Sequence, residues 1–265
     1  MELFKYETHL HTAQGSGCAT WRGSLIVERL KELGYSGAFV TDHFFNGNTA
    51  VDRRLPWDIK VHLFCQGYEE AKKRGDEIGF DVWFGWEFAM HGTEFLTYGL
   101  DKQFLLEHPE IMEMPLERYA DFIHQHGGFV VHAHPFREAG YIPSIRLYPR
   151  CVDGAEAINC GNSPDANERA SWYCDSYGIP KTGGTDGHHL WNYNSGGIAL
   201  DEKLTCAHDY LERLRAGRIT KILEPSNVAH LPWPENAWES CFRNSVDLLP
   251  EDLKERAKKF YEDLG

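Results

Sequence analysis

Two histidines lie close together near the start of the chain, at His9 and His11. Leu3, Phe4 and Tyr6 ahead of them are typical of a short strand. Because side chains alternate faces along a strand, both imidazoles point the same way, with Cα atoms about 6.6 Å apart. Two imidazoles that close can bind one cation. A strand end that faces water is the simpler explanation of one such pair. The residues downstream therefore have to decide between a metal site and an exposed strand end.

Histidines and acids recur where later apolar segments end. The full set at these expected strand ends is His9, His11, Asp42, His43, Glu87, His134, Asp186 and His188. In a barrel of parallel strands those ends meet at one face, where active sites are built. Imidazole and carboxylate ligands suit zinc, manganese or iron, so the set predicts a divalent metal site. Glu87 is in the middle of the series, and its two oxygens could bridge two cations.

Expected strands and helices alternate along the chain and would position these residues. Strands are expected at 3–6, 37–43, 82–87, 94–99, 129–135, 154–159 and 180–188. Helices are expected at 24–33, 59–78, 116–126, 164–177 and 206–216. This alternation predicts an α/β fold with parallel strands and right-handed crossovers, and its seven units suggest a (β/α) barrel one unit short of the usual eight. A doubly wound open sheet is the alternative, but no G-x-G-x-x-G follows the first strand.

The last part of the chain differs in composition and indicates a domain boundary. Residues 1–220 are expected to form the barrel, and residues 221–265 a C-terminal appendage. The appendage contains several prolines and tryptophans and ends in an expected charged helix over 250–264. It is too short to bury much core alone, so we expect it to pack on the barrel.

Charge and composition exclude several classes of function. The net charge of −13 over 265 residues disfavours nucleic acid or an anionic membrane as a partner. No apolar run approaches the ~20 residues that span a bilayer. No signal-peptide pattern opens the sequence, so a cytoplasmic location is expected. The seven cysteines form no C-x-x-C pair, which argues against a disulfide framework or a structural zinc knuckle.

Five motifs follow one another in a specific order. They are H-x-H at 9–11, T-D-H at 41–43, the strand-ending Glu87, A-H-P at 133–135 and G-T-D-G-H at 184–188. In this order they resemble the PHP (polymerase and histidinol phosphatase) superfamily of metal-dependent phosphoesterases, from about Leu3 to Ala216. The resemblance implies a distorted (β/α)7 TIM-like barrel that holds two or three divalent cations, such as manganese, zinc or iron.

The resemblance also implies which residues bind each cation. A first cation would bind His9, His11, Glu87 and Asp186. A second would share Glu87 and add His134, and a third would bind His43 and His188. Asp42 would lie outside the ligand sets and would orient one of the ligands.

Two positions depart from the family pattern. Family members commonly complete the third site with a His or Asp about five or six residues after H-x-H, where this chain has Ser16 and Gly17, with Cys18 next. The third cation is then weakly held, completed by substrate or water, or absent. On the strand after the bridging glutamate, Glu94 stands where the family commonly has a histidine. Glu94 is therefore an alternative ligand of the second cation, and His91 competes with it.

Arg137 follows the A-H-P motif and is a candidate phosphate clamp. A guanidinium beside cations is unfavourable unless an anion lies between them, which is the situation that a bound phosphate creates. A salt bridge to Glu138 or to another carboxylate explains Arg137 equally well. Arg22 and Lys181 are weaker candidates for the same role.

The motifs together predict hydrolysis of a phosphate monoester or diester by a metal-activated water. The leaving oxygen would receive a proton from His43, His188 or His132, and all three stay open. The expected partner is a small phosphate ester. Two other functions compete: an amide or lactone hydrolase on the same cluster, and a binding domain that has lost its metals and its catalysis.

Overall fold

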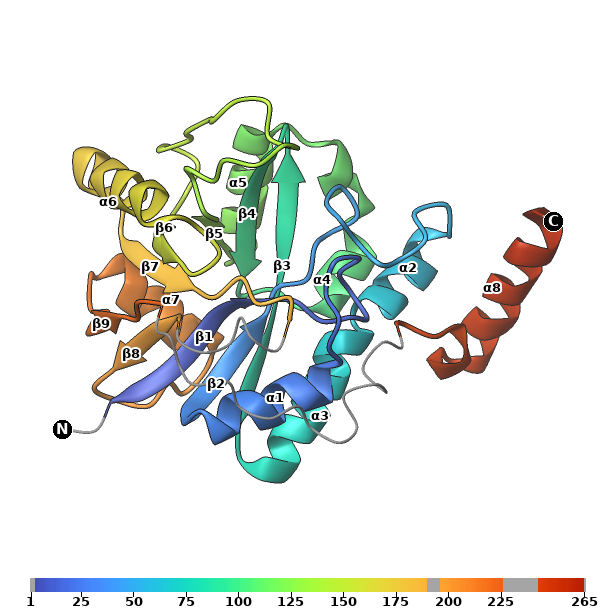
Figure 1. Cartoon of the computed structure of the whole chain (residues 1–265). Coiled ribbons are helices and arrows are strands. Elements are labelled where there is room, and N and C mark those ends of the chain that lie inside the picture. The colour runs from blue at the N-terminus through green and yellow to red at the C-terminus, as the bar shows by residue number, and fades with distance from the viewer. Residues whose placement is uncertain (1–2, 190–195, 226–242, 265) are drawn as a thin grey trace.

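A single sheet forms the centre of the described part of the chain (Figure 1). The computed structural model describes residues 3–189, 196–225 and 243–264. The strands are β1 (Phe4–Leu10), β2 (Tyr35–Val40), β3 (Asp81–Met90), β4 (Thr93–Tyr98), β5 (Phe129–His132), β6 (Gly154–Asn159), β7 (Lys181–Gly184), β8 (Ile198–Leu200) and β9 (Lys221–Ile222). Their order across the sheet is β7-β6-β5-β4-β3-β2-β1-β8-β9.

Helices connect most of the strands. They are α1 (Gly23–Glu32), α2 (Trp57–Phe64), α3 (Gln66–Ile78), α4 (Lys102–Glu107), η1 (Pro109–Glu113), α5 (Leu116–Gln125), α6 (Pro164–Tyr177), α7 (Ala207–Arg215), η4 (Val246–Leu248) and α8 (Glu251–Leu264). Helix α6 has the ends that its sequence predicts. The Ser163 hydroxyl accepts from the N–H of Ala166, and Gly178 ends the helix in left-handed backbone. The expected helix over 59–78 is divided at Cys65 into α2 and α3.

The sheet curls until its first and seventh strands meet. The N–H of His11 donates to the carbonyl of Gly187 at 3.0 Å, and the N–H of Asp186 donates to the carbonyl of His9 at 2.9 Å. On the inside, the Tyr98 hydroxyl of β4 donates to the carbonyl of Thr8 on β1 at 2.7 Å, although three strand pairings separate the two in the sheet. The α/β, barrel-like fold class is therefore confirmed.

The expectation that all strands would be parallel is wrong for β4. It pairs antiparallel with both β3 and β5. The reason is the connection: β3 turns directly into β4 through His91 and Gly92, both with positive φ, and no helix intervenes to make a crossover. As a result the first residues of β4, not its last ones, lie at the mouth of the barrel. The sequence also missed the short antiparallel strands β8 and β9 beside β1.

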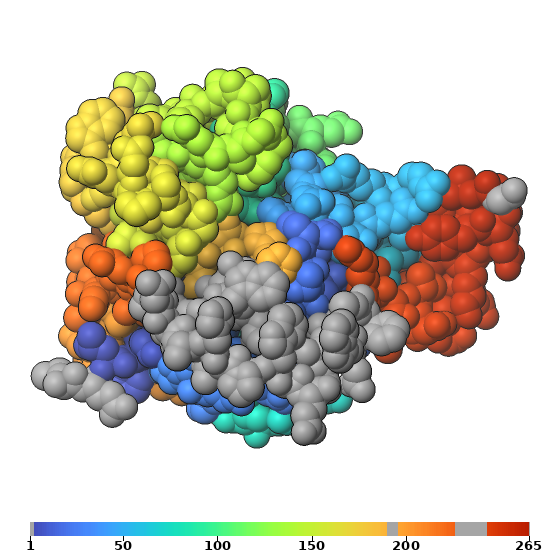
Figure 2. Space-filling model, viewed as in Figure 1, coloured from blue at the N-terminus to red at the C-terminus, as the bar shows by residue number. Residues whose placement is uncertain are grey.

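The described end of the chain packs on the α2 side of the molecule (Figure 2). Leu253 and Ala257 of α8 belong to the same buried cluster as Ile59 of α2. Arg256 forms an ion pair with Asp58 at 2.5 Å. The prolines and tryptophans of the expected appendage at 232–238, and Trp191, lie outside the described residues. Among the described residues, no helix has both the length and the apolar character to cross a bilayer.

Candidate metal centre

Histidine and acidic side chains meet at one end of the barrel, on or just after strands β1 to β5 and β7. Four overlapping groups have ligand atoms that all lie within 4.8 Å of one another. They are His9, His11 and Asp186; His9, Glu87 and His134; His43, Glu87 and Glu94; and His11, His43 and His188. The structure thus brings together the seven residues that the sequence names as ligands and Glu94, which the sequence names as an alternative ligand.

The first group forms where β1 meets the end of β7. Nε2 of His9 lies 3.1 Å from Nε2 of His11, and both nitrogens face Oδ1 of Asp186, at 3.4 and 3.1 Å. Oε1 of Glu87 lies 3.3 Å from the same nitrogen of His9. The two histidines and Glu87 are fully buried. These four side chains could surround one cation.

Two of the four groups share Glu87: one of them contains His134 and the other Glu94. Nε2 of His134 lies 3.1 Å from Oε1 of Glu87 and 3.5 Å from Oε2 of Glu94. Glu94 reaches the group because it starts the antiparallel strand β4. His91, its competitor in the sequence, lies exposed at the tip of the β3–β4 hairpin, away from the group. The structure therefore favours Glu94 as the alternative oxygen ligand.

The backbone is strained where it presents two of these side chains. His134 and Asp186 have positive φ angles of 29° and 54°, which are unfavourable for residues with a Cβ atom. Such conformations persist only where the surrounding structure enforces them, and they concentrate at functional sites. Here the two positive φ angles set the direction of the His134 and Asp186 side chains just after β5 and β7 end.

The remaining group contains His11, His43 and His188. The Nε2 atoms of His43 and His188 lie 3.3 Å apart, and the centroids of their rings lie 4.3 and 4.1 Å from the centroid of the His11 ring. Nδ1 of His43 points the other way, 2.5 Å from Oε2 of Glu87. Cys18 lies beside both imidazoles. Although burial opposes it, hydrogen bonds with His188 and His43 lower the pKa of the Cys18 thiol to about 6.

Most of these imidazoles are oriented by a second hydrogen bond on the side away from the cluster. Nδ1 of His9 pairs with Oε1 of Glu156 at 3.0 Å, Nδ1 of His11 with the Ser16 hydroxyl at 3.0 Å, and Nδ1 of His188 with the carbonyl of Asp186 at 2.8 Å. Each bond turns Nε2 inward, as at metal sites where an outer partner fixes ring and tautomer.

The sequence reasoning missed Glu156 and Ser16. Glu156 is fully buried in the middle of β6, between two alanines. A carboxylate in the interior of an otherwise apolar strand was the available signal, because such a group needs a buried partner. Ser16 gave no comparable signal.

Asp42 lies behind the cluster and outside all four groups. It accepts hydrogen bonds from the N–H and hydroxyl of Thr12 and from the hydroxyl of Ser16, each at 2.6 Å. Burial raises its pKa to about 6, against the effect of those hydrogen bonds. The loop after β1 approaches it so closely that a Cβ on Gly15 would lie 2.3 Å from its carboxyl carbon. Asp42 is therefore placed to hold this loop and, through Ser16, to orient His11.

Opposite charges dominate the electrostatics of the cluster. Although burial opposes the shift, Glu156, Asp186 and Glu87 raise the pKa of His9 well above its ordinary range. Glu87 does the same for His43. In turn, against burial, His43 and His9 lower the pKa of Glu87, and Arg137 and His9 lower that of Asp186. Protons and metal cations therefore compete for the same nitrogen atoms.

The donor set fits divalent cations. Oε2 of Glu87 and Oδ1 of Asp186 are buried and face imidazole nitrogens, yet none of their contacts with the described residues has the geometry of a hydrogen bond. Buried ionised oxygens are unfavourable unless they are paired or coordinate a metal. A mixed set of imidazoles and carboxylates is one that zinc, manganese or iron accepts.

Beside the cluster lies a cavity of about 590 Å³, whose lining includes Cys18, His43, Glu94, Arg137, Tyr141 and His188. Arg137 is held firmly at its wall. Its guanidinium pairs with Asp186 at 2.5 Å and donates to the side-chain oxygens of Asn159 and Asn162 at 2.8 and 3.0 Å. The sequence left open which carboxylate forms a salt bridge with Arg137. In the structure this partner is Asp186, whereas Glu138 pairs with Arg169.

Several other candidates lie elsewhere. Arg22 pairs with Glu70, and Lys181 with Asp175 at 2.7 Å, so neither extends to the cluster. His132 is fully buried against Phe95 and belongs to none of the four groups, and burial lowers its pKa to about 3. Of the three histidines considered as proton donors, His43 and His188 line the cavity and His132 does not.

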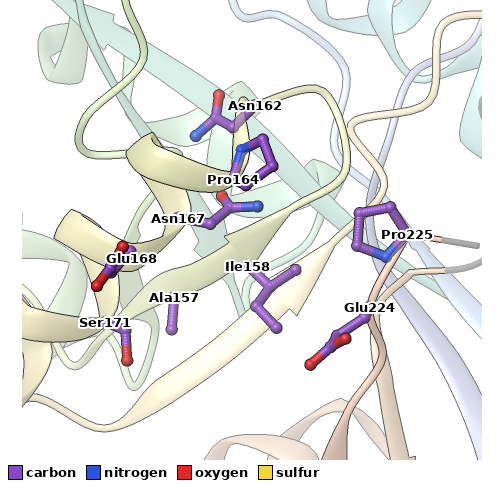
Figure 3. Close-up of a pocket in the computed structure, with 9 residues that line it drawn as sticks. All are labelled: Ala157, Ile158, Asn162, Pro164, Asn167, Glu168, Ser171, Glu224 and Pro225. Atoms are coloured by element: carbon purple, nitrogen blue, oxygen red, sulfur yellow. The ribbon is translucent and has the colours of Figure 1, made fainter.

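A second cavity, of about 480 Å³, lies between β6, α6 and the residues that follow β9 (Figure 3). Its described lining carries Glu168 and Glu224 but no histidine, cysteine or basic side chain. Asn162 is at its edge. The described lining of this cavity therefore offers no set of metal ligands like that of the first cavity.

Comparison with known proteins gives one family match and several structural likenesses. A family model described as PHP-associated matches residues 164–219. A two-domain protein from Bacteroides vulgatus ATCC 8482, described as containing a predicted PHP-like metal-dependent phosphoesterase, aligns over 82% of this chain with a TM-score of 0.60 and 15% identity. This chain spans 64% of that protein. No curated protein matches the chain.

Two further solved structures share the fold. PsfC from Pseudomonas syringae PB-5123 aligns over 82% of this chain and 95% of its own, with a TM-score of 0.54 and 16% identity. An amidohydrolase from Chromobacterium violaceum aligns over 84% of this chain and 99% of its own, with a TM-score of 0.51 and 15% identity. The family model thus shows a likeness to a PHP-associated family over residues 164–219, and the solved structures show the fold that the chain shares with them.

Proposed function

We propose that this chain hydrolyses a phosphate monoester or diester with two or three bound divalent cations. The observation that carries the proposal is the convergence of His9, His11, Glu87 and Asp186, which belong to two buried groups that share His9, with hydrogen bonds from Glu156 and Ser16 that orient the two imidazoles. The proposal also has precedent, because the Bacteroides protein of the same fold is described as containing a metal-dependent phosphoesterase.

The ligand sets of the proposal follow the groups described above. The first cation would be held by His9, His11, Glu87 and Asp186, the second by Glu87, His134 and Glu94, and the third by His43 and His188. When bound, divalent cations would lower the pKa of water and neutralise negative charge on a phosphate. Asp42 and Glu156 stay outside the ligand sets and hold the loop after β1 and the ring of His9.

The chain's own residues would bind and orient the phosphate. Arg137 lines the cavity and carries a planar fork suited to two phosphate oxygens. Its contacts with two asparagines and its ion pair with Asp186 hold that fork in place at the cavity wall. When the third site holds no cation, His43 or His188, which line the same cavity, could protonate a leaving oxygen there.

Phosphate is favoured over the carbonyl substrate of an amide or lactone hydrolase. The Chromobacterium protein is named an amidohydrolase, which supports the second candidate function. That same structure contains bound sulfate, a tetrahedral anion of the shape and charge of phosphate. A cavity that contains two arginines, Arg53 and Arg137, suits such an anion better than a neutral amide.

The test is a screen of phosphate monoesters, phosphodiesters, amides and lactones with the protein loaded separately with manganese, zinc or iron. We expect hydrolysis of a phosphate ester, and loss of both bound metal and activity in Glu87→Ala and Asp186→Ala. Glu212→Ala, an exposed change on α7, is the matched control and should change neither. An unchanged rate in either site variant would overturn the proposal, as would a protein that binds no cation.

A further inference from the structure

The loops that follow β1 and β2 pair with each other beside the metal centre. The N–H of Gly17 donates to the carbonyl of Asn48 at 2.6 Å, and the N–H of Ala50 donates to the carbonyl of Gly15 at 2.8 Å. The residues that these two loops contribute to the lining of the 590 Å³ cavity are Cys18, His43, Asn46, Gly47, Asn48 and Arg53. The position of the paired loops therefore sets the shape of that wall.

Ser16 connects the paired loops to a proposed metal ligand. Its buried hydroxyl donates to Asp42 at 2.6 Å, accepts from the N–H of His43 at 2.9 Å and lies 3.0 Å from Nδ1 of His11. Since a hydroxyl has one hydrogen, Nδ1 of His11 donates to it, which leaves the lone pair of Nε2 for a cation. Ser16 lies opposite Thr49 where the two loops pair. A displacement of the loops would therefore turn the ring of His11.

The part of the chain that contains α8 reaches both loops through one side chain, that of Asn244. Its amide nitrogen donates to the carbonyl of Gln14 at 2.7 Å, in the loop after β1, and to the carbonyl of Ala50 at 3.3 Å, in the loop after β2. An amide nitrogen carries two hydrogens, so it can hold two carbonyls at once, which a hydroxyl or a carboxylate cannot do. The neighbouring guanidinium of Arg243 donates to the carbonyl of Gly17 at 3.0 Å.

Asn244 is itself anchored to another part of the barrel. The backbone of Ser245 exchanges two hydrogen bonds with the side chain of Gln66 at the start of α3, both at 2.8 Å. Further along, Leu253 of α8 belongs to the same buried cluster as Val51 of the second loop. The amide of Asn244 is therefore held in place by α3, independently of the two carbonyls that it binds.

We propose that Asn244 is a positioning residue of the metal centre, which joins the two loops and, through Ser16, holds His11 in the orientation that a cation requires. The inference rests on the proposed function only for the cation site that contains His11. Asn244 is not among the residues that line the cavity. Its effect on a bound cation must therefore pass through the loops.

The affinity of the full-length chain for zinc, measured by competition with a chelator, tests this role. Loss of an outer partner of a metal ligand lowers affinity by about 10- to 100-fold, and Asn244 lies one contact further out, so we expect a fall of about 10-fold in Asn244→Ala. Asn244→Asp should lose at least as much, because a carboxylate would face two carbonyl oxygens. Gln125→Glu, the same exchange of an amide for a carboxylate at an exposed position of α5, is the matched control and should keep the affinity.

A double variant shows whether the effect passes through Ser16. Ser16→Ala removes the hydroxyl that contacts His11 and should lower the affinity by itself. Residues that act through one network are not additive. We therefore expect Asn244→Ala to lower the affinity little further when Ser16→Ala is already present, which a residue that only stabilises the fold would not produce.

Hydrogen exchange of the same variants separates the loops from the fold as a whole. In Asn244→Ala the N–H groups of Gly17 and Ala50 should exchange faster, whereas those of β5 and β6 should keep their rates. If circular dichroism shows that Asn244→Ala is unfolded, Arg243→Ala becomes the deciding variant. It removes an exposed side chain, frees only the carbonyl of Gly17 and should give a smaller fall in zinc affinity.

The outcomes distinguish this inference from the proposed function. An affinity equal to that of the control, a full further fall in the presence of Ser16→Ala, or faster exchange throughout the sheet overturns the role of Asn244 and leaves the proposed reaction standing. A fall that depends on Ser16, in a protein that hydrolyses no phosphate ester, supports the positioning role and overturns the proposed reaction. A protein that binds no zinc overturns both.

Discussion

Nδ1 of His9 lies 3.0 Å from Oε1 of Glu156, and both side chains are completely buried. The other oxygen of Glu156 accepts from the N–H of His134 at 2.9 Å and from the side chain of Asn159 at 2.8 Å. One carboxylate on β6 thus orients a ring on β1 and the backbone of a second proposed ligand after β5. Glu156 therefore fixes the positions of ligands from two of the proposed cation sites relative to each other.

Glu156→Gln should weaken cation binding without unfolding the barrel. Glutamine keeps the shape of the side chain but removes the charge that favours a proton on Nδ1 of His9. Loss of such an outer partner typically lowers metal affinity by about 10- to 100-fold. Competition with a chelator measures the affinity, and Glu212→Gln on the exposed face of α7 is the control. Equal affinities in the two variants would contradict this role for Glu156.

Cation binding at neutral pH should release protons. Glu156, Asp186 and Glu87 raise the pKa of His9, and Glu87 raises that of His43, in each case against burial. The raised pKa values favour a proton on each ring before a cation arrives, so affinity should rise as the pH increases through those values. Titration calorimetry in two buffers with different ionisation enthalpies measures the released protons. Binding heats that do not depend on the buffer would count against competition at these rings.

Arg137→Lys should lower the rate on phosphate esters while the bound cations remain. Lysine keeps the charge but loses the fork, and with it the contacts to Asn159 and Asn162. Hydrogen bonds to charged groups contribute about 1.5–3 kcal/mol, which corresponds to about a 10- to 150-fold fall in kcat/KM. Arg169→Lys, at the exposed pair with Glu138, is the control. A rate as high as that of the control would show that Arg137 does not take part in substrate binding.

Asp153 should make stability depend on pH. It accepts from His124 at 2.7 Å, from the N–H of Val130 at 3.0 Å and from Arg215 at 2.8 Å. Although burial opposes the shift, these hydrogen bonds lower its pKa. A carboxyl with a lowered folded pKa stabilises the protein above its unfolded value, about 3.9, and loses that effect as the pH falls through the folded value.

Asp153→Asn should therefore lower the free energy of unfolding by about 1–3 kcal/mol at pH 7. The difference from the unaltered protein should shrink steadily below about pH 4, where the carboxyl begins to take up a proton. Urea unfolding at a series of pH values measures both. A difference of the same size at pH 7 and pH 2.5 would show that packing, not charge, explains the loss.

Gly184→Ala should destabilise the barrel and displace His9. A Cβ at this position would lie 2.4 Å from Cβ of His9 and 2.5 Å from Oε1 of Glu156, so one of them must move. Overpacking of this kind typically costs about 1–3 kcal/mol. Gly140→Ala, where the new methyl group meets no atom within 4 Å, is the matched control in urea unfolding. Equal stabilities of the two variants would mean that β1 and β7 can separate freely here.

The sequence by itself determined the fold class and the residues at the mouth of the barrel. Helical and strand periodicity are local properties, so the alternation of elements could be read along the chain. Parallel strands place their ends on one face, so His9, Glu87, His134 and Asp186 could be predicted to meet although 177 positions separate the first from the last.

Only the tertiary structure decided which other side chains join them. Glu94 reaches the mouth because the β3–β4 hairpin reverses the direction of one strand, and Glu156 faces His9 because the sheet curls until β6 lies within reach of β1. Cys18 lines the same cavity as His43 and His188 because the loop after β1 is anchored to the residues around both. These contacts depend on strand direction, curvature and loop path, which arise from long-range packing and leave no periodic signal in the sequence.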